Sequence, residues 1–76
     1  MYSLIFLAKL GRQIKYYRTT KGVSQEELAN TLGMRRSYFG SIERGEKNMT
    51  IATILSVCDG LGISPAELFS AAEKGE

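Results

Sequence analysis

Apolar residues recur at steps of three or four along the whole chain, which is the spacing of amphipathic helices. The first stripe consists of Leu4, Leu7, Leu10, Ile14 and Tyr17. A later stripe consists of Ile51, Ile54, Leu55 and Cys58. The pattern predicts five helices, over about residues 3–20, 25–32, 36–44, 51–60 and 65–73. No segment alternates with a period of two, so we expect an all-α fold without a sheet.

Capping signals support the predicted helix ends. Ser24 and Glu27, and again Ser64 and Glu67, have the spacing of a capping box, in which each side chain accepts a backbone N–H that the first helical turn leaves without a partner. Thr50 is expected to cap the fourth helix in the same position.

The 76 residues predict one small domain spanning residues 1–76. A chain of this length buries only roughly 60% of its unfolded surface, so additional support for the core is expected. A single cysteine, Cys58, and the lack of histidine exclude an internal disulfide and a zinc site of the usual spacing. We therefore expect a second copy of the chain as the support, and no metal or other cofactor.

The positive and negative charges lie in different halves of the chain. Residues 1–21 contain five basic and no acidic residues, whereas residues 48–76 contain one basic and four acidic residues. This distribution favours one face for an anionic polymer and one turned away from it. A solvated basic helix face is the alternative explanation.

Residues 1–8 are apolar, but Lys9 ends the run far short of a membrane span. No basic residue precedes the run and no small-residue cleavage site follows it. We expect a cytoplasmic protein with no membrane partner, in agreement with a free thiol. An enzyme is not expected, because the chain has no histidine, no metal-ligand cluster and no glycine-rich phosphate loop.

The second and third predicted helices, joined by a glycine-containing turn, have the pattern of a helix-turn-helix. Arg35 stands where a helix favours a side-chain acceptor, and Arg35 and Arg36 put positive charge beside the positive end of the helix dipole. Such a departure from a local stability rule is typical of a functional site. The arginine fork matches O6 and N7 of guanine. Ser37 and Ser41, one turn apart, are expected on the same exposed face; two solvated arginines without a function are the alternative.

Several short motifs follow one another over about sixty residues. They are Leu10-Gly11-Arg12, the run from Lys21 to Ala29, Gly33-Met34, Arg36-Ser37-Tyr38, the run from Ser41 to Gly45, and Glu67-Leu68-Phe69. Together they resemble the Cro and phage-repressor-like helix-turn-helix family. The length, the apolar N-terminus and Arg36-Ser37-Tyr38 are most similar to the small controller proteins of restriction-modification systems. The resemblance implies a compact five-helix, lambda-repressor-like domain that binds double-stranded DNA at a near-palindromic operator as a homodimer and regulates transcription.

The resemblance also implies roles for individual residues. Base contacts fall on Arg35, Arg36, Ser37 and Ser41. Contacts to the DNA backbone fall on Gln25, Tyr38, Arg44, Lys47 and Asn48. Arg18 and Glu43 match a structural pair that joins the first helix to the third beneath the DNA face. Candidates for the dimer interface are Ile63, Leu68 and Phe69, although Leu68 and Phe69 fit the core equally well.

Gly40 departs from the family pattern, which usually has a larger residue there, and it costs up to about 1 kcal/mol of helix propensity. The second functional class that we consider is an antitoxin-like or adaptor module of the same fold, with weak DNA binding and a protein partner. The arginine pair argues against it, because an adaptor has no need of donors at that position. No sensing domain is evident, so no small-molecule effector is expected.

Overall fold

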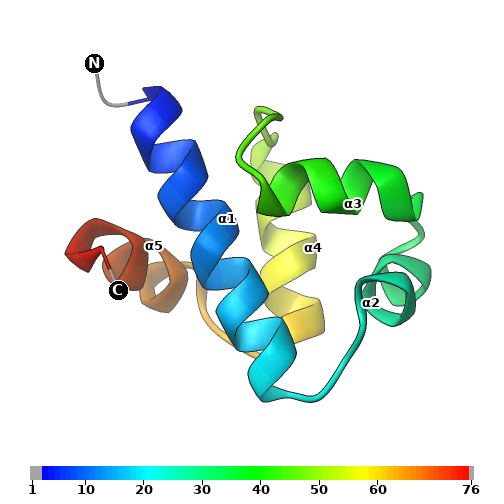
Figure 1. The fold of residues 1–76 in the computed structure, drawn as a ribbon. Coiled ribbons are helices and arrows are strands. Elements are labelled where there is room, and N and C mark those ends of the chain that lie inside the picture. The colour runs from blue at the N-terminus through cyan, green and yellow to red at the C-terminus, as the bar shows by residue number, and fades with distance from the viewer. Residues whose placement is uncertain (1–2, 76) are drawn as a thin grey trace.

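The computed structural model describes residues 3–75. It contains five helices, which are α1 (Ser3–Thr20), α2 (Gln25–Leu32), α3 (Arg36–Glu43), α4 (Ile51–Leu61) and α5 (Pro65–Lys74) (Figure 1). The predicted all-α fold is confirmed, and no strand occurs within the described residues. The observed helix ends differ from the predicted ones by at most one residue.

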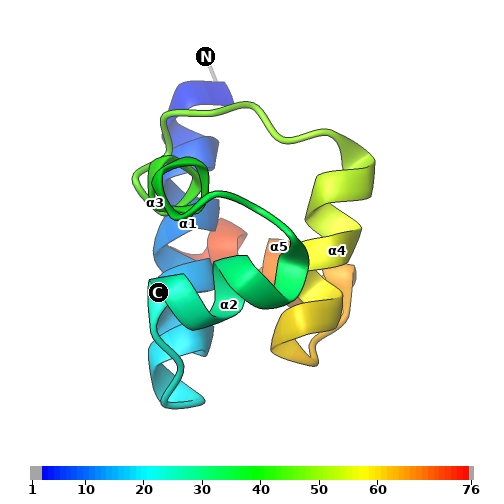
Figure 2. The ribbon, with the colours of Figure 1, turned by 90° about the vertical axis from the view of Figure 1, so that its right-hand side faces the viewer.

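Helix α1 lies in the middle of the molecule. It packs against α5 on one side and against α3 and α4 on the other (Figure 1). Helix α2 packs against α3 and α4, and Figure 2 shows the side of the molecule that these three helices form. The helix-turn-helix of α2 and α3 is therefore on the side away from α5.

The core receives side chains from every helix. Ile14, Leu28, Phe39, Val57 and Leu68 are each at most 4% exposed. The predicted buried positions Leu10, Ala29, Ile42, Ile54 and Cys58 belong to the same cluster. One contiguous core therefore holds the helix-turn-helix against the rest of the domain.

Two glycines bring the backbones of α1 and α3 close together. A Cβ atom at Gly11 would lie 2.6 Å from the carbonyl oxygen of Ile42. Gly45, which follows α3, has a φ of +74°, and a Cβ atom there would lie 2.6 Å from the Cα of Ala8. A larger side chain at either position would force the C-terminal end of α3 away from α1, so these contacts fix where α3 lies.

Several apolar positions are not where the periodicity placed them. Leu4 is 75% exposed because the first turn of α1 extends beyond the neighbouring helices (Figure 1). Ile51 and Leu55 are 70% and 49% exposed, because the inward face of α4 is formed by its other apolar residues. Membership of an apolar stripe therefore did not bring these three side chains into the core.

Leu68 belongs to the core and not to a subunit interface. Its side chain is fully buried within the single chain, which leaves no surface for a partner, so the interface assignment of Leu68 is wrong. Phe69 is partly buried against the core, and its ring stacks on Phe6 with centroids 5.7 Å apart. Ile63 is also only partly buried.

No single helix within residues 3–75 is both long and apolar enough to cross a bilayer, and only the pair α4 and α5, bent by 95°, meets that test by length and composition.

Candidate nucleic-acid interface

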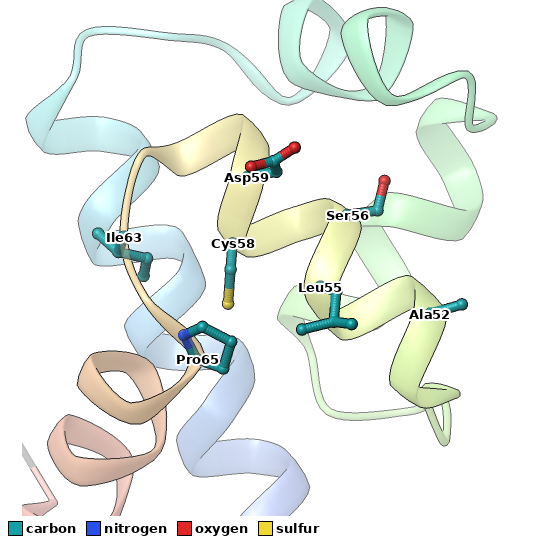
Figure 3. Close-up of a pocket in the computed structure, with 7 residues that line it drawn as sticks. All are labelled: Ala52, Leu55, Ser56, Cys58, Asp59, Ile63 and Pro65. Atoms are coloured by element: carbon teal, nitrogen blue, oxygen red, sulfur yellow. The ribbon is translucent and has the colours of Figure 1, made fainter.

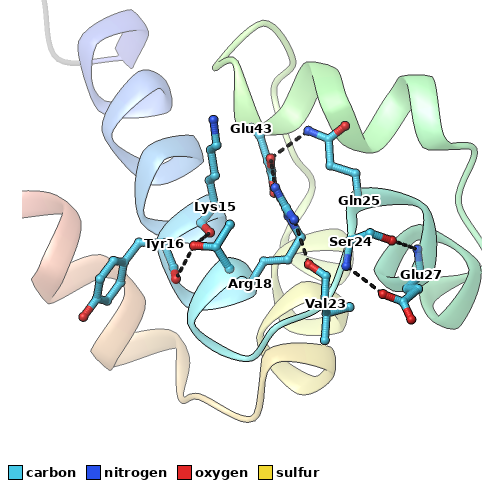
Figure 4. A network of polar contacts seen from close by, with 9 residues as sticks. Lys15, Tyr16, Arg18, Val23, Ser24, Gln25, Glu27 and Glu43 are labelled. Atoms are coloured by element: carbon cyan, nitrogen blue, oxygen red, sulfur yellow. Dashed lines mark hydrogen bonds and ion pairs between the residues drawn. The ribbon is translucent and has the colours of Figure 1, made fainter.

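The sequence of α2 fixes both of its ends. The Oγ of Ser24 accepts a hydrogen bond from the backbone N–H of Glu27 at 3.0 Å, and the Glu27 carboxylate accepts the N–H of Ser24 at 2.9 Å (Figure 4). Gly33 then ends the helix with a φ of 70°. The backbone N–H of Met34 donates to the carbonyl of Ala29 at 2.8 Å. The short turn that leads into α3 is thus held to the end of α2.

The beginning of α3 lacks such a cap. Arg35 occupies the N-cap position with an extended backbone, and its side chain makes no capping hydrogen bond. Arg35, Arg36 and Ser37 are all exposed. The first turn of α3 therefore directs two guanidinium groups and one hydroxyl into solvent.

The inner side of α3 is held by a buried polar network that joins three helices (Figure 4). The Nε of Arg18 donates to the Oε2 of Glu43 at 2.6 Å, and its Nη2 donates to Oε1 at 3.2 Å. The same Oε1 accepts the side-chain amide of Gln25 at 2.8 Å. Arg18 also donates to the carbonyl of Val23 at 2.7 Å. Because the carboxylate has donors from α1 and α2, it fixes the orientation of α3 relative to both.

The structure thus places Arg18 and Glu43, the pair implied by the resemblance, in direct contact. Their side chains are only 9% and 3% exposed. Burial leaves Glu43 no access to DNA. Gln25, expected at the DNA backbone, uses its amide nitrogen in the network and is half-buried.

The outer surface at the end of α3 carries a second ion pair. The Nε of Arg44 donates to the Oε2 of Glu46 at 3.0 Å, and both side chains are more than half exposed. This hydrogen bond, together with the charge of the Glu46 carboxylate, raises the pKa of Arg44 above its ordinary value. Lys47 and Asn48 are exposed in the same loop.

Ser41 is not on the exposed face. It is only 6% exposed, and its Oγ donates to the carbonyl of Tyr38 at 2.6 Å. The last five residues of α3 are all buried because this end of the helix lies against α1 and α2. The expectation that Ser37 and Ser41 share an exposed face is therefore wrong. Tyr38, between them, is half-buried against the core.

Two features of this side of the molecule were missed in the sequence. The pairing of Glu46 with Arg44 had no motif to mark it. The exposure of Ile51 and Leu55 on α4 had no signal either, because a stripe does not show which of its members has a neighbour.

Comparison with known proteins places this geometry in a family. A model described as a helix-turn-helix domain matches residues 9–69. The control protein C.SmaI of Serratia marcescens is 36% identical over 61 residues, which cover 80% of this chain and 73% of the relative.

Solved structures agree. The restriction-modification controller protein C.AhdI of Aeromonas hydrophila has a TM-score of 0.78 and 45% identity, over 82% of this chain and 94% of that one. The controller protein C.Esp1396I, crystallised as a tetramer with its natural 35 base-pair operator, has a TM-score of 0.82 and 34% identity, over 92% of both chains. This chain therefore belongs to the helix-turn-helix family that includes transcriptional regulators and the restriction-modification controller proteins.

Proposed function

We propose that this protein is a sequence-specific regulator of transcription that binds double-stranded DNA as a homodimer, and that it is the controller of a restriction-modification system. The observation that carries the DNA-binding role is the uncapped start of α3, where Arg35, Arg36 and Ser37 project into solvent. The names of the controller relatives support the biological role.

The start of α3 would enter the major groove and read base edges. Arg36 and Arg35 present planar forks that suit guanine, and Ser37 adds a hydroxyl on the same exposed turn. The hydroxyl of Ser41 is already engaged with the Tyr38 carbonyl, so we give Ser41 no share in base reading. The protein would be held in register by contacts to phosphates from residues on either side of α3, namely Gln25, Tyr38, Arg44, Lys47 and Asn48.

A second copy of the chain would cover the exposed apolar residues of α4. Ile51 and Leu55 lie on one side of that helix, and Leu55 borders a hollow of about 390 Å³ (Figure 3). Ile63, from the connection between α4 and α5, and Pro65, the first residue of α5, line the same hollow. A self-complementary apolar contact of this kind is what a two-fold dimer needs. We therefore replace Leu68 by Leu55 in the interface and keep Ile63 at its edge.

Replacement of Leu55 by glutamate tests this interface. The substitution puts a charge on an exposed surface of the monomer, so we expect the domain to fold but the dimer to dissociate. Sedimentation over a micromolar concentration series measures the change, and Leu4→Glu on α1 is the matched control. A wild-type protein that stays monomeric throughout, or a Leu55→Glu variant that stays dimeric, would refute the interface.

The DNA-binding function is tested by selection of bound duplexes from a random pool. The two-fold dimer should enrich a near-palindrome with half-sites about one turn, roughly 34 Å, apart. We expect the selected duplex to bind at least about a thousandfold more tightly than a scrambled one. If the pool stays unenriched and binding fades with salt alone, only the electrostatic component is present. That result would favour the adaptor module.

A further inference from the structure

Glu46 is the one exposed carboxylate between residues 28 and 58, a stretch that includes α3 and the loop after it. The other acidic residue in this range, Glu43, is buried in the polar network. An exposed negative charge here opposes binding to phosphates. Solubility alone therefore does not explain why a carboxylate stands beside Arg44 and Lys47.

The hydrogen bond of Glu46 fixes one end of the Arg44 guanidinium. Its Oε2 accepts Nε at 3.0 Å, and neither terminal nitrogen of Arg44 has a partner among residues 3–75. The two terminal amino groups therefore remain available to an anion, while the guanidinium is held by its third nitrogen.

Gly40 provides the surface on which this guanidinium lies. A Cβ atom at Gly40 would be 3.2 Å from Nη1 of Arg44 and 3.6 Å from Oε1 of Gln25. The two long side chains thus approach the same point of α3, one from the first residue of α2 and the other from the C-terminal end of α3. Gln25 is held there by its hydrogen bond to Glu43, and Arg44 by its hydrogen bond to Glu46.

We propose that Glu46 is a positioning residue: it holds Arg44 over Gly40 beside Gln25, so that Arg44 and Gln25 together engage one phosphate of the operator. This inference rests on the proposed function. Glu46 thereby improves a contact made only when the protein is in register. Its charge meanwhile weakens contacts to any duplex alike, so only the positioning of Arg44 raises the preference for the operator over random DNA.

The test is Glu46→Gln, which removes the charge and keeps the shape. We expect binding to random duplex to tighten and binding to the selected duplex to tighten less. The ratio of the two affinities should fall by up to about fivefold, the size of an exposed ion-pair effect. Both affinities are measured by titration of the full-length protein at one salt concentration.

Two further variants separate positioning from simple charge. Glu26→Gln removes an exposed carboxylate from the first turn of α2, so both affinities should tighten alike. In an Arg44→Ala background, Glu46→Gln should no longer lower the ratio, because the side chain that it positions is gone.

Equal changes in Glu46→Gln and Glu26→Gln, or a fall in the ratio that persists without Arg44, would overturn the inference. If the wild-type protein selects no duplex, the proposed function fails first and this inference fails with it. If it selects one and the ratio does not respond to Glu46→Gln, only the positioning role fails.

Discussion

The inner and outer sides of α3 carry ion pairs of opposite character. Glu43 and Arg44 are neighbours in the sequence, yet Glu43 pairs with Arg18 inside the protein and Arg44 pairs with Glu46 outside it. The side chains of the inner pair are 9% and 3% exposed, and those of the outer pair 60% and 55%. The inner carboxylate accepts three hydrogen bonds from two side chains, whereas the outer one accepts a hydrogen bond from Arg44 alone among the described residues.

The two ion pairs therefore have different roles at one short helix. A buried ion pair is only weak evidence of net stability, but loss of one partner leaves an uncompensated charge in the core. An exposed pair contributes little to stability because water and salt screen it. The inner pair therefore determines where α3 lies, and the outer side of α3 remains available for contacts with DNA.

The largest expected effect is that of Glu43→Ala. The substitution leaves the Arg18 guanidinium buried without its carboxylate and should cost about 3–5 kcal/mol of unfolding free energy. A domain of this size has only a few kcal/mol to lose, so most of the protein should unfold. Urea denaturation followed by circular dichroism measures the change. Glu46→Ala is the control and should leave the midpoint nearly unchanged; equal losses in the two variants would remove the contrast between inner and outer sides.

On the outer side, Arg36→Ala should change DNA recognition and not stability. Loss of a bidentate contact to guanine should cost about 1–3 kcal/mol of discrimination at one base pair in each half-site. The measurement is titration of the selected duplex and of duplexes changed at single positions. An equal loss on selected and random DNA would show that Arg36 contacts only the backbone.

Lys47→Ala is the matched comparison from the neighbouring loop. Lysine is a flexible point charge that can reach a phosphate on any duplex. Binding should therefore weaken alike on every duplex, and the dependence of log K on log salt should become shallower by about one. A base-specific loss in this variant would move Lys47 into the recognition surface.

The fold could be predicted from the sequence because its signals are local. Ser24, Thr50 and Ser64 each accept the expected N–H, and every observed helix end lies within one residue of its prediction. Burial was predicted less well, since Leu4 and Ile51 belong to apolar stripes but lie where no neighbouring helix reaches them. A stripe gives the face of a helix, and only the tertiary packing decides how much of that face is covered.

The residues of the candidate site also fall into those that local sequence rules predict and those that depend on tertiary packing. Arg35 and Arg36 could be identified as site residues by a local rule, because they depart from the residue preferences at the start of a helix. The contact between Arg18 and Glu43 joins residues 25 positions apart, so no spacing could give it, and only the resemblance pointed to it. Burial of Ser41 depends on how α1 and α2 close around the end of α3, which periodicity within α3 does not contain.

The smallest expected effect concerns the missing cap of α3. In Arg35→Ser the new hydroxyl can accept the N–H of Tyr38, as Ser64 accepts that of Glu67 at 3.0 Å, and the helix should gain about 1 kcal/mol. For a domain of this length that gain raises the melting temperature by roughly 4–8 °C. Operator affinity should fall in the same variant, because one guanidinium leaves the DNA face. The control Ser64→Ala removes an existing cap of the same kind and should lower the melting temperature by a similar amount. If Arg35→Ser gains stability and keeps full affinity, the uncapped start of α3 is not a compromise with DNA recognition, and Arg36 and Ser37 alone account for the reading of bases.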